Sequence, residues 1–406
     1  MKIDRVLQRI ILPLFCILLS LEGSAKRYEI NLSDSSRISL LTCSPGNELY
    51  SIFGHSAIRV SDPMRNLDIV FNYGTFDFFD PNFYPNFVRG RLKYILSVSP
   101  YREFKQSYVE EGRWIWEQRL NINLNEKQHL FDSLLINYRP ENRYYPYDFF
   151  GDNCATRIRD IFVKTIPREI TFDYSSFEKG KSFRQLLMPN LIHSHWAKLG
   201  INLLLGLPAD RVASSWEYMY LPEHLQAAFQ HSSLLSDSVK QPFAQQPKVL
   251  LEGKQFSDQN IWGTPLQVSL VILLIAAFLS YRDLKSGVKD LWFDRILLIL
   301  FGLLGVLFTF LWAGTAHRSM VWNFNLLWAN PFHLIAVFFL SVKKTRQWMR
   351  TYLSVNLIVL IALLITWPFL PQALPWVIYP VVLAMAMRLF VIIQLPHWLE
   401  KIIWRR

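Results

Sequence analysis

The stretch that decides the fold is HSAIRV at residues 55–60, in which buried and exposed positions follow a period of two. Such a period predicts a β-strand with one face against a core. A polar turn at residues 61–66 and a second strand at residues 68–74 follow, so we expect an antiparallel hairpin. In that hairpin, the end that carries His55 lies opposite Asn72 and Tyr73.

Further elements lie on both sides of this hairpin. Strands are predicted at residues 37–42 and 114–120, and helices at residues 48–53 and 126–138. Asn123 or Asn125 would cap the second helix. Another helix is expected from Asn153 to about Lys164, because apolar residues recur there at helical spacing.

Cys154 lies in the motif DNCAT at residues 152–156, where the last of these helices begins. The first amide N–H groups of a helix have no internal partner, and with the helix dipole they stabilise a thiolate. The same N–H groups can hold the oxyanion of a tetrahedral intermediate. We therefore expect Cys154 to be a nucleophile.

His55 is the expected partner of this cysteine. A catalytic thiolate needs a base, and the base needs a third group that orients its ring. Asn72 is the first candidate for that group, because it lies opposite His55 in the predicted hairpin. Asp148 and Asp152, near Cys154 in the sequence, are its rivals.

Structural roles are the alternatives for these residues. A single cysteine is most often a small buried apolar residue, and a single histidine at a strand end is most often structural. Cys43 and Cys154 could also form a disulfide in an oxidising compartment, which would exclude catalysis. His193 and His195 form an H-x-H pair without further ligands nearby, so neither a metal site nor a cofactor is expected.

The N-terminus predicts an export signal at residues 1–25. Positive residues precede a twelve-residue apolar run that is too short to span a bilayer, and small residues favour cleavage before Lys26. An uncleaved signal anchor is the alternative. The exported catalytic domain would then comprise residues 26–230, and the polar, Gln- and Ser-rich residues 231–263 predict a linker.

From about residue 264 the composition becomes apolar, which predicts an all-α membrane domain over residues 264–406. Five transmembrane helices are expected, at residues 265–281, 295–312, 326–342, 353–369 and 374–393. If the preceding domain is exported, the first, third and fifth helices end inside. Eleven Lys and Arg residues then lie on the inner side, against Arg318 alone in the short outer loops.

The net charge of +11 first suggests a nucleic-acid partner, but its distribution argues against one. Residues 264–406 carry 13 Lys+Arg and 4 Asp+Glu, a net of +9, whereas residues 26–263 carry 27 and 26. Nucleic acid requires a clustered basic face, and the exported domain is nearly neutral. The basic excess therefore follows the positive-inside rule, and no nucleic-acid partner is expected.

Six blocks of the chain resemble the Lnb-type family of Bacteroidota, which joins a periplasmic domain to a membrane domain. They are LLTCSPGNELYSIFGHSAIRV at residues 40–60, FNYGTFDF at 71–78, YDFFGDNCATR at 147–157, GINLLLG at 200–206, LP at 221–222 and the segment 317–328. The order of histidine before cysteine, with the cysteine opening a helix after an asparagine, is similar to a circularly permuted NlpC/P60 (papain-like) fold. The resemblance thus implies an α+β papain-like periplasmic domain followed by five transmembrane helices.

The function that this resemblance implies is lipoprotein N-acylation. An acyl chain would pass from a phospholipid, through a Cys thioester, to the α-amine of a diacylglyceryl-cysteine lipoprotein. Lecithin:retinol acyltransferases are similar in the order of their residues and also use a Cys thioester. Carried over residue by residue, Cys154 becomes the nucleophile, His55 the base and Asn72 the third member. The implied location is the bacterial inner membrane, with the catalytic domain in the periplasm.

Substrate binding is expected of five residues in the resembling blocks, namely Tyr50, Tyr73, His317, Asn323 and Asn325. For the last three, anchoring at the membrane interface with helix capping is the alternative. An aromatic-rich stretch could also rest at the interface or line an acyl groove, with ordinary packing as its alternative. This stretch contains Phe78, Phe79, Phe83, Tyr84 and Phe87.

Two other classes of function are open. One is a membrane-tethered NlpC/P60-like cysteine hydrolase that cleaves peptides or amides of the cell envelope. The other is a non-catalytic membrane scaffold in which Cys154 is structural. A soluble substrate would not require five transmembrane helices, which favours a lipid substrate.

Overall fold

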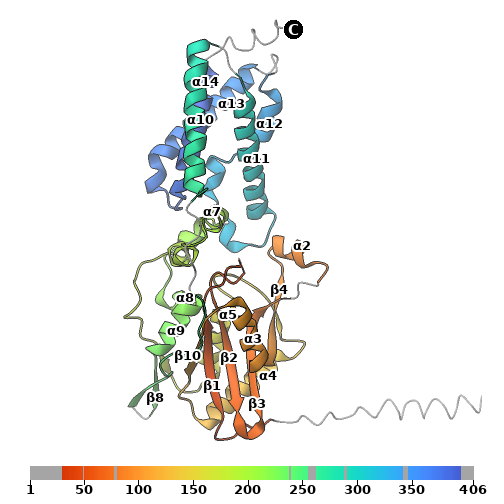
Figure 1. Ribbon diagram of the computed structural model, residues 1–406, viewed down its shortest axis with the longest axis vertical. Coiled ribbons are helices and arrows are strands. Elements are labelled where there is room, and N and C mark those ends of the chain that lie inside the picture. The colour runs from red at the N-terminus through yellow and green to blue at the C-terminus, as the bar shows by residue number, and fades with distance from the viewer. Residues whose placement is uncertain are drawn as a thin grey trace, which may run out of the picture.

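The computed structural model describes residues 30–48, 50–76, 80–236, 239–254, 262–287, 290–341 and 346–394. It has two parts in line, an N-terminal domain built on a β-sheet and a bundle of long helices (Figure 1). The predicted signal at residues 1–25 lies outside the described residues, as do Lys289, Lys343, Lys344 and the cationic tail at 401–406.

A seven-stranded sheet forms the centre of the N-terminal domain, in the order β10-β5-β1-β2-β3-β4-β6. Its strands are β1 (Arg37–Cys43), β2 (His55–Asp62), β3 (Leu67–Thr75), β4 (Lys93–Pro100), β5 (Ile115–Arg119), β6 (Tyr144–Pro146) and β10 (Lys248–Leu251). Neighbouring strands all pair antiparallel. The four strands predicted from the sequence are confirmed as β1, β2, β3 and β5.

The hairpin of β2 and β3 turns at η1 (Pro63–Arg65) and opens at its other end. The strands pair from Asp62 opposite Leu67 to Ile58 opposite Phe71, and no pairing between them is recorded beyond that point. The separation leaves the backbone at the start of β2 accessible to another element. α5 (Cys154–Thr165) begins at this opening.

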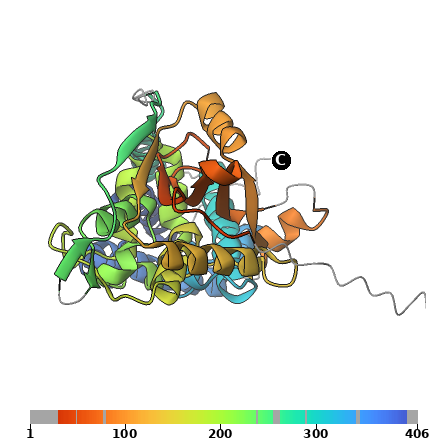
Figure 2. The same ribbon diagram turned by 90° about the horizontal axis from the view of Figure 1, so that it is seen from below.

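Helices cover both faces of the sheet. α4 (Leu124–Tyr138) and α5 pack on one face in the main core, with buried Phe131 and Phe162. α3 (Tyr101–Glu111) covers a smaller core on the other face, which includes Cys43. Figure 2 shows α3, in orange, and α4, in gold, on opposite sides of the strands. The predicted helix at residues 126–138 is confirmed as α4, and Asn123 caps it.

Part of the predicted linker at residues 231–263 folds with the N-terminal domain. β8 (Ser233–Ser236) and β9 (Val239–Pro242) join β7 (Ile170–Thr171) in a small sheet, and β10 extends the large sheet beside β5. Polar composition suggested a tether, but an edge strand keeps many exposed side chains and needs few buried anchors. Leu234, Phe243 and Ala244 are those anchors. Residues 255–261 lie outside the described residues.

The helix predicted at residues 48–53 is also wrong, because the described residues there form turns. Instead, the amide of Gly46 bonds to the carbonyl of Ser51, and that of Gly54 to the same carbonyl, at 2.9 and 3.0 Å. The chain is thereby turned back into β2.

Short helices complete the N-terminal domain and its boundary with the helical bundle. They are α2 (Phe83–Val88), α6 (Phe183–Leu187), η2 (Met188–Leu191), α7 (His195–Leu204), η3 (Leu207–Asp210), α8 (Ser215–Tyr218) and α9 (Pro222–Gln230). Figure 1 shows α7 at the boundary between the two parts, directly below the bundle.

Four helices among the described residues are long and apolar enough to cross a membrane, namely Pro265–Ser286, Trp292–Ala313, Gln347–Phe369 and Trp376–Gln394. They correspond to α10 (Pro265–Ser286), α11 (Trp292–Ala313), α13 (Arg346–Thr366) with η7 (Trp367–Phe369), and η8 (Trp376–Ile378) with α14 (Tyr379–Gln394). Buried Arg388 joins three of these helices: it contacts Asp283 of α10 and Asp294 of α11, each at 2.8 Å. A charge buried in this way is tolerated because it is paired.

The third predicted transmembrane helix, at residues 326–342, is not one continuous helix. The chain forms η4 (Arg318–Met320), η5 (Phe324–Leu327) and then α12 (His333–Phe339), whose seven residues span only about 10 Å. Pro331 has no amide hydrogen, and the amide of Phe332 bonds to the side chain of Asn330 at 3.0 Å, so side chains replace helical hydrogen bonds here.

This broken segment follows α11 back along its length. A Cβ at Gly305, in the middle of α11, would collide with the carbonyl of Ala329. Toward the end of α11 that is far from the N-terminal domain, Arg295 donates to Ser341 at 2.8 Å. The chain therefore returns to that end of the bundle through a partly helical path beside α11.

Candidate functional site

Cys154 is the first residue of α5, and Asn153 holds the start of that helix. The side-chain oxygen of Asn153 accepts the amides of Ala155 and Thr156 at 2.9 and 3.0 Å. Its side-chain nitrogen donates to the carbonyl of Tyr220 at 2.9 Å. The predicted helix from Asn153 to about Lys164 is confirmed as α5. A helix start leaves its first amides without internal partners. The cap accepts those of Ala155 and Thr156, so the amide of Cys154 is the one that remains for another acceptor.

His55 is delivered to this helix start by a sharp turn. Gly54 has φ +75°, and a Cβ there would lie 2.8 Å from the carbonyl oxygen of Cys43. Only glycine combines this conformation with so close a contact. The turn makes His55 the first residue of β2, at the open end of the β2–β3 hairpin.

Asn72 of β3 completes the cluster, although the observed β2–β3 register, if continued, would set Gly74 rather than Asn72 opposite His55. Its side-chain oxygen accepts a hydrogen bond from Nε2 of His55. Nδ1 is then the ring nitrogen available to the thiol. Both rivals for this position are engaged elsewhere: Asp148 accepts the amide of Gly151 at 2.8 Å, and Asp152 pairs with Arg157.

The cluster favours a thiolate and an imidazolium. Burial raises the pKa of Cys154. The positive charge of His55 and the hydrogen bonds from His55 and the amides of Ser56 and Ala155 lower it by more, so the pKa of the thiol is lowered overall. Burial lowers the pKa of His55, but the charge of Cys154 and hydrogen bonds to Cys154 and Asn72 raise it more. The amide of Ser56 reaches the sulfur because β2 and β3 separate at this end of the hairpin. The site therefore holds a thiol and an imidazole in hydrogen-bond contact, an arrangement suited to a nucleophile and its base.

Two further residues at the site were not predicted from the sequence. Gly74, at φ +87°, faces Cys154 so closely that a Cβ would lie 3.4 Å from the cysteine Cβ and 3.9 Å from its amide nitrogen. The hydroxyl of Tyr145 on β6 lies 3.9 Å from the same point, is buried and has no hydrogen-bond partner. A buried donor without a partner is rare in proteins. Together with the amide of Cys154, it is suited to hold an oxyanion.

Cys43 does not share the chemistry of Cys154. Both are free thiols, so the alternative disulfide is not formed in the structure. Cys43 packs in the small core beneath α3, whereas Cys154 belongs to the main core with α5. Burial raises the pKa of Cys43 to about 12, despite a hydrogen bond to Tyr108 that lowers it.

Tyr50 and Tyr73, predicted to bind substrate, occupy different surroundings. Tyr50 is 62% exposed on the loop before β2. Its ring meets that of Phe76 edge to face, with 6.4 Å between the ring centroids. Tyr73 is buried on β3, and its hydroxyl accepts a hydrogen bond from Asn137 at 2.9 Å. Its ring packs against Tyr145 at 6.3 Å, so Tyr73 supports the position of that hydroxyl.

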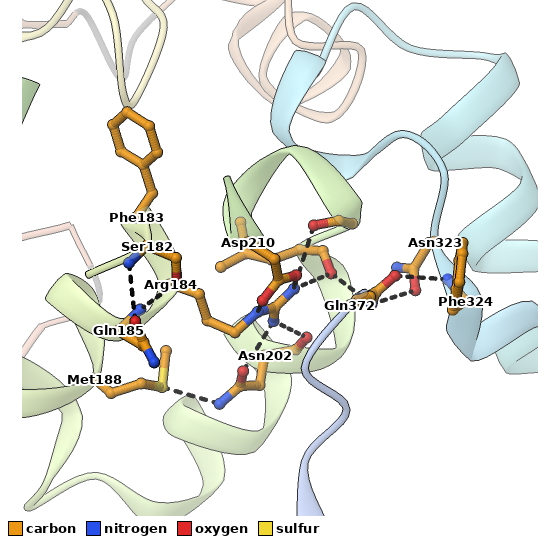
Figure 3. Close-up of polar contacts among 12 residues, drawn as sticks. Ser182, Phe183, Arg184, Gln185, Met188, Asn202, Asp210, Asn323, Phe324 and Gln372 are labelled. Carbon is orange, nitrogen blue, oxygen red and sulfur yellow. Dashed lines mark hydrogen bonds and ion pairs between the residues drawn. The ribbon is translucent and has the colours of Figure 1, made fainter. Parts of the chain in front are cut away.

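Asn323 and Asn325 lie in a joint between the two parts of the molecule (Figure 3). The carbonyl of Leu203, at the end of α7, accepts hydrogen bonds from Asn323 and Asn325 at 2.8 and 3.0 Å. Gln372 donates to the carbonyl of Leu205 at 3.2 Å. These bonds satisfy carbonyls that a helix end leaves without partners, and they match the capping alternative.

Arg184 holds the N-terminal side of the same joint. It pairs with Asp210 at 2.8 Å and donates to the carbonyls of Asn202 and Leu205 at 2.8 and 3.0 Å, with nearly its whole side chain buried. Figure 3 shows this guanidinium between Asp210 and Asn202, with Gln372 on the other side. The joint is thus a continuous network of satisfied polar groups, which makes a defined rather than a sliding contact.

His317 forms a second contact between the parts, away from the thiol. Its Nε2 donates to the carbonyl of Phe87 at 3.1 Å, and the amide of Ala316 bonds to the carbonyl of Arg89 at 2.8 Å. Gly90, at φ +66°, leaves room for the imidazole, since a Cβ there would lie 3.0 Å from it. His317 therefore fastens α2 to the segment that follows α11.

In the part of the chain that the structure describes, no group of three His, Cys, Asp or Glu side chains is arranged to hold a metal ion.

Comparison with protein families finds two matches. A model described as the Lnb N-terminal periplasmic domain matches residues 25–182, and a model described as the Lnb transmembrane domain matches residues 257–397. The first includes His55, Asn72, Tyr145 and Cys154. Comparison with curated proteins and with solved structures gives no match. The papain-like relationship therefore stays a prediction.

The thiol pair predicts a specific pattern of alkylation. Iodoacetamide should modify Cys154 of the folded protein at pH 7 faster than it modifies an ordinary cysteine, because the lowered pKa of this thiol leaves more of it as thiolate. The rate should fall only as the pH drops through that lowered pKa. Cys43 should stay unmodified, since its pKa is raised to about 12. Mass spectrometry of the two cysteine peptides measures both rates.

His55→Ala is the decisive variant for this pattern. Without the imidazolium, the thiolate loses its main stabilising charge, and alkylation of Cys154 at pH 7 should slow about tenfold or more. Asn72→Ala should slow it less, because the ring remains but is no longer oriented. Equal rates in the wild type and His55→Ala would contradict the assignment.

Proposed function

Because the chain belongs to the Lnb family and is a multi-pass membrane protein with a periplasmic domain, we propose that it is a lipoprotein N-acyltransferase. Its donor is a phospholipid of the inner membrane, and its acceptor is the α-amine of a diacylglyceryl-cysteine lipoprotein. The observation that carries the proposal is the Cys154–His55–Asn72 cluster, in which the thiol pKa is lowered and the histidine pKa is raised.

The first half-reaction acylates the enzyme. The Cys154 thiolate attacks the carbonyl carbon of a phospholipid acyl ester, and the oxyanion forms between the amide of Cys154 and the hydroxyl of Tyr145. The C–O ester bond breaks while the new C–S bond remains. The imidazolium of His55 gives its proton to the departing glycerol oxygen, which leaves a lysophospholipid.

The second half-reaction transfers the chain. The amine of the lipoprotein attacks the thioester carbonyl, and neutral His55 takes the proton that the amine loses. A C–N amide bond forms, the C–S bond breaks, and the Cys154 thiolate returns beside a protonated His55. A thioester is reactive enough toward an amine that no nucleotide is needed. Cys154 is only 8% exposed, and this burial limits hydrolysis of the thioester by water.

The path from the site to the membrane supports a lipid substrate. The side-chain nitrogen of Asn153 donates to the carbonyl of Tyr220, and the hydroxyl of Tyr220 donates to the carbonyl of Phe183 at 3.0 Å. Phe183 precedes Arg184 of the joint. The start of α5 is therefore held at a defined distance from the membrane helices, as a reaction between two membrane-anchored substrates requires.

A transfer assay tests the proposed function. The full-length protein in nanodiscs is mixed with a phospholipid that carries one isotope-labelled acyl chain and with a diacylated lipopeptide. We expect mass spectrometry to find the triacylated lipopeptide and an equal amount of lysophospholipid. Cys154→Ser should abolish transfer, whereas Cys43→Ala, a matched change of the other thiol, should retain it.

Transfer that survives Cys154→Ser would contradict the proposal. Release of labelled free fatty acid without any triacylated lipopeptide would instead support a hydrolase, and inactivity of the wild type toward either product would remove the enzyme assignment.

Tyr145→Phe tests the oxyanion role, because it should slow acyl transfer and leave alkylation of Cys154 unchanged. Loss of one oxyanion donor lowers turnover by about 10², so acyl transfer should fall by that order. Alkylation of Cys154 by iodoacetamide forms no oxyanion and should keep its rate. Tyr73→Phe is the matched control, because it removes a hydroxyl that already has a partner, and it should affect transfer much less. A parallel loss of alkylation in Tyr145→Phe would point to general damage of the site.

A further inference from the structure

α2 lies beside the outer end of a membrane-spanning helix. α11 ends at Ala313, and three residues later the chain bonds to the end of α2 through Ala316 and His317. Figure 1 shows α2 projecting from the N-terminal domain at the boundary with the bundle. These contacts hold α2 at the level where the outer leaflet meets water.

The surface of α2 has the composition of a membrane-contacting element. Tyr84, Phe87 and Val88 are exposed by 71%, 50% and 46% on a helix of only six residues. Apolar and aromatic side chains gathered at this level are typical of segments that enter the interface. A soluble surface would rarely present three of them together.

Exposed cations follow directly after this helix. They are Arg89, Arg91 and Lys93, and Arg318 of η4 is exposed on the neighbouring segment. Cations beside an apolar surface at a membrane are suited to the phosphates of lipid head groups. The charge and the exposed side chains thus point to the same class of ligand.

A row of aromatic rings connects α2 to the thiol. Phe83 of α2 lies 5.5 Å from Phe76, Phe76 lies 5.4 Å from Tyr94, and Tyr94 stacks on Tyr147 at 4.0 Å, all between ring centroids. Tyr147 is close enough to Cys154 that the charge of the thiolate raises the pKa of this tyrosine, in addition to burial.

The last three rings of the row are only half-buried. Each of these rings therefore keeps part of its surface accessible. Phe78 and Phe79, which the sequence grouped with α2, lie outside the described residues.

We propose that residues 83–93 are the docking segment for the phospholipid donor. Tyr84, Phe87 and Val88 enter the outer leaflet, the following cations hold the head-group phosphate, and one acyl chain lies along the aromatic row with its ester carbonyl at Cys154. The donor occupies this row because the chain to be transferred must have its carbonyl at the thiol. The inference rests on the proposed function and adds the route of the donor.

The test compares two donors in three proteins. The first protein is the wild type, the second is the triple variant Tyr84→Ser, Phe87→Ser and Val88→Ser, and the third is a control that removes three exposed apolar side chains from α3, α4 and α5 (Val109→Ser, Ile136→Ser and Val163→Ser). The donors are phosphatidylethanolamine in nanodiscs and p-nitrophenyl butyrate in solution. Acylation of Cys154 by the soluble ester needs no contact with the membrane.

We expect transfer from phosphatidylethanolamine to fall about tenfold or more in the α2 variant and to persist in the control. Release of p-nitrophenol should be similar in all three proteins. The proposal is overturned if the α2 variant uses phosphatidylethanolamine as well as the control does, or if it loses both donors equally. Failure of the proposed function is distinct, because the wild type itself would then transfer nothing from phosphatidylethanolamine.

Discussion

The side-chain amide of Asn153 is the contact on which both the site and its position depend. Its oxygen accepts two amides and its nitrogen donates to two carbonyls, so its full hydrogen-bonding capacity is used within the protein. Capping by asparagine contributes about 1 kcal/mol to a helix and decides where the helix starts. Here it starts α5 at Cys154, which leaves the amide of that residue for the reaction and ties it to Tyr220.

The same constraint explains how a domain built on a sheet is aligned with a membrane. From Tyr220 the hydrogen bonds continue to Phe183 and to the joint around Arg184, where Asn323 and Gln372 meet the end of α7. The broken segment beside α11 is the counterpart of this joint. A continuous helix would have its backbone groups paired within itself, whereas the turns leave asparagine side chains to cap α7.

Much of the site could be predicted from the sequence, because its members obey local rules. Cys154 follows a capping residue, and Asn72 lies on the neighbouring strand at the same end of one hairpin as His55. Tyr145 and Gly74 could not be found in this way, since pairing of β6 with β4 brings the tyrosine to the thiol and no sequence spacing encodes it. Composition alone also missed β10 and the break at Pro331, where a few buried or capping side chains outweigh the average character of the segment.

The central claim is that Cys154 carries the acyl chain between donor and acceptor. The most direct measurement is the mass of the Cys154 peptide after the full-length protein has been held in phospholipid nanodiscs without any lipopeptide and quenched in acid. The account predicts a peptide heavier by one acyl chain of the lipid supplied, which neutral hydroxylamine removes as expected for a thioester. An unmodified Cys154 in protein that does form triacylated lipopeptide would contradict it.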